Sequence, residues 1–296
     1  MTPFTAVIVL HDSEAELAAL LPSLAVHLPE PPQLVVVDTG SRDGGPELAR
    51  RHGAELVELA DNPGFGAASN AGVGRARHDV TVLLNPDTEL IDDSVHELAR
   101  LARTHPHALH APRLLERDGS VQRSAHPLPG TAGALLPALV HPPLLPRALR
   151  ERAEPFRAER GRTVGWAIAA CLAARTETLR RLGPFDPGIF LYAEDLDLGL
   201  RAADAGVQTW FWPAACVLHT RAHATRRAFG GEPVELLARR RRAVIAARRG
   251  PARARIDDLV QALTFTDRIL LKTLAGRDTA RERRQLAALR AARRAT

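Results

Sequence analysis

Cysteine and lysine are nearly absent from this chain of 296 residues. Its two cysteines, Cys171 and Cys216, give no disulfide framework and no metal-ligand spacing. We expect both to be small core residues of a protein in the reducing cytoplasm. Lys272 is the only lysine, so arginine supplies almost all of the positive charge.

Long hydrophobic segments are missing as well. The longest clean apolar run covers residues 164–174, which is well short of the roughly 20 residues that span a bilayer. The first residues lack the basic start and the apolar core of a secretory signal. We therefore expect a protein that is not integral to a membrane, with peripheral attachment to the inner face of the cell membrane as an alternative.

The glycine pattern of dinucleotide-binding proteins is also missing. The first apolar run, residues 6–10, is followed by His11, Asp12 and Ser13, where a nicotinamide-dependent oxidoreductase would have Gly-x-Gly-x-x-Gly. This difference argues against that class of enzyme. Ser13 instead matches the N-cap of a helix.

Negative charge is scarce in the last quarter of the chain. From residue 221 onward there are 20 Lys and Arg against 7 Asp and Glu, whereas residues 1–220 have 20 against 27. Such a basic tail is either a solvated helix surface or a surface attracted to anionic lipid. Its only aromatics are Phe229 and Phe265, too few for a stacking series, so we expect no nucleic-acid partner.

The first part of the chain alternates short apolar runs with helical patterns. The runs cover residues 6–10, 34–37, 55–59 and 80–84, and the helical patterns between them begin near residues 13, 46 and 67. This alternation predicts an α/β protein with a mostly parallel sheet flanked by helices. In such sheets ligands bind at the carboxyl ends of the strands.

Several polar residues follow the predicted strands. Asp38 ends the second run, and a carboxylate there can accept the ring N–H of a uracil or thymine. In the loop after the third run, Gly64 allows close approach of the backbone to a ligand. Asn70 offers an amide from the next helix, although it equally fits a polar residue that faces solvent.

The fourth run ends in Asn85, Pro86 and Asp87. The proline stiffens the exit from the strand, and the Asp87 carboxylate points away from its tip. One hard oxygen ligand at this place suits Mg²⁺ or Mn²⁺ held otherwise by a diphosphate and water. We therefore expect a divalent cation at Asp87.

A second acidic cluster, Glu194, Asp195 and Asp197, precedes a helical pattern of leucines. First-turn acids complement the helix dipole, and Asp197 is spaced to pair with Arg201, so capping explains Asp197 best. Glu194 and Asp195 follow an aromatic, apolar loop. Partial desolvation there would raise a carboxyl pKa and suit a general base. Capping and catalysis both remain open for these two from the residues alone.

Five ordered segments resemble family 2 glycosyltransferases of the GT-A fold, particularly bacterial rhamnosyltransferase-type members. They span roughly residues 5 to 220 and are VVVDTGSRDG, NPGFGAASNAG, LLNPDTEL, GPFDPGIFLYAEDLDLGLRAADAG and VLHT. Two departures stand out. Asn85 replaces the first aspartate of the Asp-x-Asp metal motif, and Pro187 replaces the usual glutamate of Gly-Gly-Phe-Asp-Glu.

The resemblance implies a role for each matching residue. Asp38 would bind the nucleobase, and Asp195, with Glu194 beside it, would deprotonate the acceptor hydroxyl. Asp87 would stand at the metal position, with His219 completing the site and His223 as a competing ligand. The implied donor-binding residues are Asp38, Gly64, Asn70, Asn85 and Asp87. The expected apolar wall and acceptor platform comprise Trp166, Phe185, Phe190 and Tyr192, whereas Trp210 and Trp212 are expected in the core.

The implied activity is inverting transfer of a sugar, rhamnose or a related hexose, from a nucleoside-diphosphate sugar. The acceptor would be a hydroxyl of a glycan or lipid-linked glycan in bacterial cell-envelope polysaccharide synthesis. The alternative is a non-catalytic sugar-nucleotide or glycan-binding protein of the same fold. The intact acids Asp87, Glu194 and Asp195 argue against that alternative.

The expected domain organisation is a GT-A catalytic domain followed by a basic helical extension. The catalytic domain covers residues 1–222, with a donor-binding half to about 125 and an acceptor-binding half at 126–222, and the extension covers 223–296. Within the extension, apolar residues at helical spacing run from Ile256 to Leu274. They would pack on the catalytic domain or on a second subunit of a homo-oligomer, or else lie on an anionic membrane surface.

Overall fold

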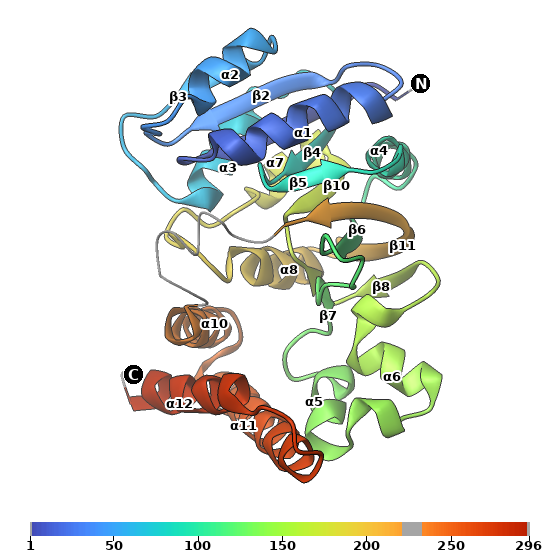
Figure 1. The fold of residues 1–296 in the computed structure, drawn as a ribbon, viewed down its shortest axis with the longest axis vertical. Coiled ribbons are helices and arrows are strands. Elements are labelled where there is room, and N and C mark those ends of the chain that lie inside the picture. Colours follow the sequence, from blue (N-terminus) through green and yellow to red (C-terminus); the bar gives the residue numbers. More distant parts are fainter. Residues whose placement is uncertain (1, 221–232, 295–296) are drawn as a thin grey trace.

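The computed structural model describes residues 2–220 and 233–294 (Figure 1). The expected domain boundary near residue 222 and the candidate ligand His223 lie outside the described residues. A nine-stranded sheet forms the upper part of the view, and three helices of the extension lie below it. The predicted α/β architecture with a C-terminal helical extension is confirmed.

Parallel strands build the N-terminal half of the sheet, in the order β3-β2-β1-β4. These four strands are Thr5–Leu10 (β1), Gln33–Asp38 (β2), Glu55–Glu58 (β3) and Val80–Leu84 (β4). They match the four apolar runs of the sequence, because strands covered on both faces need apolar side chains on both faces. Ile8 and Val7 accordingly point into the hydrophobic clusters on opposite faces.

The other half of the sheet is mixed and continues as β10-β6-β11-β5, with β8 paired to β11. Strand β10 is antiparallel to both neighbours, whereas β6 and β11 are parallel. The bounds are Thr88–Leu90 (β5), Ala108–Leu115 (β6), Arg162–Val164 (β8), Cys171–Arg175 (β10) and Gln208–His219 (β11). Strands Ala125–His126 (β7) and Trp166–Ala167 (β9) form a separate pair.

Helices cover both faces of the sheet. One face carries Glu14–His27 (α1), Gly45–Arg51 (α2) and Ser94–Thr104 (α4), and the other carries Phe65–Gly74 (α3), Thr176–Leu182 (α7) and Glu194–Asp204 (α8). Leu17, Leu20 and Leu24 of α1 fill the core of the first face. Leu198 and Ala202 of α8 fill that of the second.

The extension contains helices Val234–Arg249 (α10), Pro251–Leu274 (α11) and Ala280–Arg294 (α12). Leu196 and Leu200, on the side of α8 away from the sheet, pack against Val244 and Ile245 of α10. Helix α8 therefore lies between the sheet and the extension, as Figure 1 shows. Helices Ala132–Leu139 (α5) and Arg147–Ala153 (α6), with short 3-10 turns at Pro142–Leu144 and Pro155–Arg157, lie beside β8 and the end of α11.

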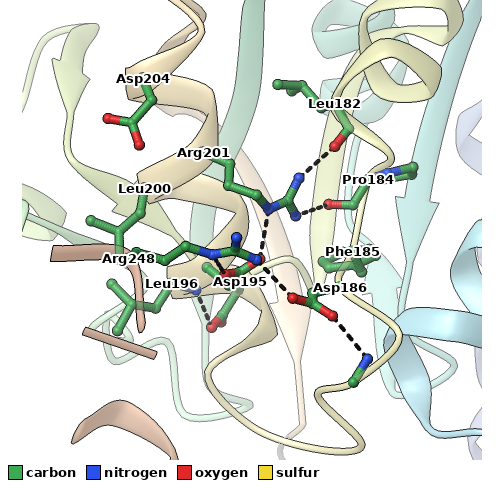
Figure 2. A network of polar contacts seen from close by, with 12 residues as sticks. Leu182, Pro184, Phe185, Asp186, Asp195, Leu196, Leu200, Arg201, Asp204 and Arg248 are labelled. Carbon is green, nitrogen blue, oxygen red and sulfur yellow. Dashed lines mark hydrogen bonds and ion pairs between the residues drawn. The ribbon is translucent and has the colours of Figure 1, made fainter. Parts of the chain in front are cut away.

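Ion pairs reinforce the contact between α8 and α10 (Figure 2). Asp197, which is 1% exposed, accepts from Arg201 at 2.7 Å and from Arg248 of α10 at 2.6 Å. Arg248 also donates to Asp186, and Arg249 forms two bonds to Asp204. The predicted pairing of Asp197 with Arg201 is confirmed, and Asp197 is a structural residue.

Helix α11 exposes most of its apolar face and buries part of its polar face. Its buried residues are Ala254, Asp257 and Asp258, and both aspartates pair with arginines of α10. Most of the apolar stripe is exposed, namely Ile256, Leu259, Leu263, Leu270, Leu271 and Leu274. Most of the stripe is therefore not covered by the catalytic domain, whose helix α5 contacts α11. Along residues 2–220 and 233–294, no helix has a stretch long and apolar enough to cross a bilayer.

Strand β11 places Trp210 and Trp212 differently, although both were expected in the core. Phe211 between them is fully buried, whereas both tryptophans are only partly buried and stack on each other with ring centroids 5.2 Å apart. Of the two, Trp212 packs against the hydrophobic core of the first face, as expected. Of the two cysteines, Cys171 is buried as expected and Cys216 is only partly buried.

Candidate active site

A cavity of about 670 Å³ lies between the carboxyl end of β4, the start of α8 and the helices of the extension. The predicted catalytic residues Glu194 and Asp195 and the predicted metal ligands Asp87 and His219 all line it. Asn85, predicted at the donor, and Trp166 and Tyr192, predicted at the acceptor, line it as well. Residues from α10, α11 and α12 complete the wall: Leu237, Arg241, Gln261, Phe265, Arg281, Gln285 and Leu289. The extension is therefore part of the site.

The tip of β4 presents Asn85 and Asp87 to the cavity. The Asn85 backbone is fixed because its N–H donates to the Ala170 carbonyl and its carbonyl accepts from Thr88. Its side-chain oxygen is buried and has no hydrogen-bond partner among the described residues. Leaving a buried oxygen without a hydrogen bond costs roughly 1–3 kcal/mol of stability. This cost favours binding of a ligand that supplies a cation or a hydrogen-bond donor.

His219 faces Asp87 from the end of β11, with Nε2 3.4 Å from Oδ1 of the carboxylate. Buried Gln122 donates from Nε2 to the His219 carbonyl, so its Oε1 is directed at Nδ1 of the ring, 2.9 Å away. This pairing gives Nδ1 an acceptor for its proton, and the other ring nitrogen, Nε2, faces the Asp87 carboxylate. A neutral imidazole in that tautomer would present Nε2 as a metal ligand.

These residues fit a divalent cation, although only in part. Asp87 and Asn85 supply oxygen and His219 supplies nitrogen, which are all suitable donors. Among the described residues no group of three or more His, Cys, Asp or Glu side chains forms a metal cage. A cation here needs further oxygen ligands from a bound diphosphate or water.

Glu194 and Asp195 begin α8 at the cavity wall. The two residues before them, Tyr192 and Ala193, have φ of 66° and 68°, a left-handed conformation that costs about 1–3 kcal/mol for a residue with a side chain. This backbone turn directs the first turn of the helix, and with it both carboxyl groups, into the cavity. Strain of this kind is typical of functional sites.

Burial sets the protonation of this acid pair. Desolvation raises the pKa of Glu194 to about 8, helped by the nearby charge of Asp195. Desolvation also raises the pKa of Asp195, to about 6, opposed by hydrogen bonding to the Leu196 N–H and by the charge of Arg241. The two carboxyl groups therefore hold a proton more readily than two free acids, and Asp195, whose pKa rises less, is the better placed of the two to be ionised and to accept a proton.

Trp166 and Tyr192 line the cavity as predicted, but Phe185 and Phe190 do not. Phe185 is buried in the core of the second face. Phe190 is 46% exposed, and Leu191 takes its place in the wall. Trp166 stacks on His126 with ring centroids 4.2 Å apart, and its buried Nε1 lacks an acceptor within the described part of the chain. An oxygen of a bound sugar would satisfy that N–H.

Asp38 and Gly64 lie outside the residues that line this cavity. The Asp38 carboxylate, at the end of β2, accepts the backbone N–H groups of Gly40 and Ser41. Gly64 has φ of 89°, and a Cβ there would lie 2.2 Å from the Phe190 carbonyl oxygen. The glycine is thus required by the loop that precedes α8, and its role at a ligand stays a prediction.

Asn70 uses its amide for two contacts within the protein. Its Nδ2 donates to the Phe185 carbonyl at 2.8 Å, and its Oδ1 accepts the Phe185 N–H at 3.0 Å. The side chain thus bridges α3 to the loop before α8, and this explains why a polar residue stands in the helix. A donor-binding role for Asn70 stays a prediction.

The residues that sequence reasoning missed are Gln122 and the wall formed by the extension. Gln122 lies in a turn without a recognisable motif, and only the fold brings it to His219. The spacing of arginines in the extension indicated a basic surface, but gave no sign that Arg241 and Arg281 reach the cavity.

Known proteins resemble this chain in sequence. The family model for glycosyl transferase family 2 matches residues 5–171. An N-acetylglucosaminyl-diphospho-decaprenol L-rhamnosyltransferase of Mycobacterium tuberculosis is 31% identical over 230 residues, which cover 71% of this chain and 74% of the relative. The match to the family model includes the tip of β4.

Solved structures share the fold. The mannosyltransferase PcManGT from Pyrobaculum calidifontis, in complex with GDP-Man and Mn²⁺, has a TM-score of 0.60 at 16% identity, covering 99% of this chain and 86% of its own. Residues 1–349 of TarS from S. aureus have a TM-score of 0.55 at 14% identity, covering 90% and 72%. The family match over more than half of the chain, with the mycobacterial relative, establishes that this protein is a glycosyltransferase and belongs to glycosyl transferase family 2.

Proposed function

We propose that this enzyme is an inverting glycosyltransferase that moves rhamnose or a related hexose from a nucleoside-diphosphate sugar to a lipid-linked glycan. The observation that carries the proposal is that Asp195 and the Asp87–His219 pair line one cavity. One side of the site thus offers a base, and the other a place for a diphosphate and its cation.

The name of the mycobacterial relative supports the substrate class. That protein is named for rhamnosyl transfer with N-acetylglucosaminyl-diphospho-decaprenol, a sugar joined to a lipid through a diphosphate. We infer an acceptor of the same chemical class for this chain, used in the synthesis of a bacterial cell-envelope polysaccharide. We also propose that residues up to about 125 bind the donor, with Asp38 at the nucleobase, and that residues 126–222 contribute to acceptor binding.

In the proposed reaction the acceptor hydroxyl attacks the anomeric carbon of the donor from the face opposite to the diphosphate. A new C–O bond forms, the bond to the diphosphate oxygen breaks, and a nucleoside diphosphate leaves. Asp195 takes the hydroxyl proton. Trp166 and Tyr192 shield the anomeric carbon from water, which would otherwise hydrolyse the donor.

We propose that Asp87, His219 and Asn85 hold a divalent cation, with Gln122 orienting the histidine. When bound, the cation neutralises charge on the diphosphate leaving group. The nitrogen ligand suits Mn²⁺ better than Mg²⁺, which prefers oxygen. The Mn²⁺ in the structure of the mannosyltransferase agrees with this choice.

Asp195→Asn should abolish transfer while leaving donor binding nearly unchanged, because the carboxylate acts on the acceptor proton. Loss of a general base typically lowers the rate by about 10² to 10⁴. In the unmutated enzyme kcat/KM should fall as the pH drops through about 6, since Asp195 must be ionised to accept a proton. Calorimetry with the donor confirms folding of the variant, and turnover like that of the unmutated enzyme would remove Asp195 from this role.

Asp87→Ala should weaken binding of a nucleoside diphosphate in Mn²⁺ and make the remaining binding insensitive to EDTA. The reason is that Asp87 is the only carboxylate at the tip of β4. Titration calorimetry of both proteins with and without EDTA measures the effect. If the unmutated protein binds and reacts equally well in EDTA, the cation site is wrong and Asn85 belongs to a metal-independent enzyme.

We further propose that the enzyme acts from the cytoplasm at an anionic membrane surface. The supporting observation is the exposed apolar face of α11, defined by Ile256, Leu259, Leu263, Leu270, Leu271 and Leu274. Helix α5, none of whose residues is buried, contacts α11 and exposes Leu139. An exposed apolar helix face in a strongly basic extension is suited to anionic lipid head groups and the underlying acyl chains.

The double variant Leu263→Asp, Leu270→Asp should lose co-sedimentation with anionic phosphatidylglycerol vesicles at low salt by at least about tenfold. Val26→Asp on α1 is the control, because Val26 is also an exposed apolar residue, and this variant should bind vesicles like the unmutated protein. If the unmutated protein ignores vesicles and light scattering shows a dimer that the double variant breaks, α11 is instead a subunit interface.

A further inference from the structure

The wall of the cavity that comes from α11 and α12 mixes cationic, amide and apolar side chains. Arg281, at the beginning of α12, and Gln285 one turn later provide the polar part. Phe265 of α11 and Leu289 of α12 provide the apolar part. The site residues described above do not use this wall.

Positive charge is concentrated behind the wall. Arg123 and Arg268 both lie near the single carboxylate of Glu154, at 3.5 Å and 4.0 Å, and Arg157 bonds to the same group at 2.7 Å. Burial, together with the neighbouring arginines, lowers the pKa of Arg268 to about 10, and the charge of Arg281 contributes to this decrease. The same causes lower the pKa of Arg123. Crowded arginines that depress one another's pKa create a field that favours an anion.

Arg241 also lines the cavity, and it is held in place by contacts within the protein. Its Nε and Nη2 bond to the two oxygens of Asp257 at 2.8 Å each, and Gln261 donates to the same carboxylate. This bidentate pair joins α10 to α11 and fixes the cationic side of the cavity. Arg281 is exposed at the cavity, where a ligand can reach it.

We propose that Arg281 and Gln285 bind the diphosphate of the acceptor, with Phe265 and Leu289 against the first carbons of its prenyl chain. This inference rests on the proposed function, which supplies a prenyl-diphosphate sugar as acceptor. The donor also carries a diphosphate, but the candidate cation site for it lies at the tip of β4. Apolar side chains beside the arginine match a hydrocarbon attached directly to the anion, which a nucleoside diphosphate lacks.

The proposal also connects the cavity to the membrane-facing surface. Phe265 lines the cavity, and Leu259, Leu263 and Leu270 lie on the exposed side of the same helix. A prenyl chain that leaves the cavity beside α11 would therefore pass next to the apolar face proposed to contact lipid.

Binding of farnesyl diphosphate to the full-length protein tests the proposal, followed by the fluorescence of the three tryptophans, one of which lines the cavity. Arg281→Gln should weaken this binding at least about tenfold, as expected for a lost charge-assisted contact, and Arg281→Lys should restore part of it. Arg284→Gln removes the same charge from an exposed position on α12 that does not line the cavity, and should bind like the unmutated protein. Farnesol, which has no diphosphate, should bind all variants equally weakly.

Two results would overturn the inference. One is equal binding of farnesyl diphosphate by Arg281→Gln and Arg284→Gln. The other is an equal loss of affinity for dTDP or UDP in Arg281→Gln, which would assign the arginine to the donor. Selective loss of farnesyl diphosphate binding, in a protein that transfers no sugar to any prenyl-diphosphate acceptor, would support the binding site and overturn only the proposed function.

Discussion

The site depends on the ion pairs that join α10 to α8. Asp197 is almost fully buried, and an unpaired carboxylate there would carry a large desolvation cost. Arg201 on its own helix supplies one partner and Arg248 on α10 the other, so docking of the extension satisfies a charge that belongs to the catalytic domain. The same contact brings α10, α11 and α12 over the start of α8, where they close a cavity that the catalytic domain alone leaves incomplete.

Within this cavity, burial performs two chemical tasks. It raises the pKa of both Glu194 and Asp195, because two adjacent carboxylates in a poorly solvated place cannot both ionise easily. It also leaves the Asn85 oxygen and the Trp166 N–H without hydrogen bonds from the described residues. Buried polar groups without hydrogen-bond partners favour a bound ligand that supplies those partners. The acid pair supplies the base that accepts the hydroxyl proton.

The sequence predicted well what depends on local pattern. Buried strands, the polar residues at their ends and the acids at the start of α8 follow from hydrophobicity and chain order, which the fold preserves. It predicted poorly what depends on direction. Asn70 and Phe190 lie in the expected segments, but the Asn70 side chain bonds to the Phe185 backbone and Phe190 lies outside the cavity. In α11 the helical period identified the apolar face but not the direction in which that face points, since the partly buried arginines of α10 attract the aspartates of the opposite face.

The central claim is that substrates contact both the catalytic domain and the C-terminal helices of one site. Hydrogen–deuterium exchange of the full-length enzyme with a nucleoside diphosphate and a prenyl-diphosphate sugar tests this claim most directly. The account predicts slower exchange on binding in three places at once: the end of β4, the start of α8, and the inner turns of α11 and α12. Protection confined to residues before 220, with α11 and α12 exchanging as in the free enzyme, would contradict it.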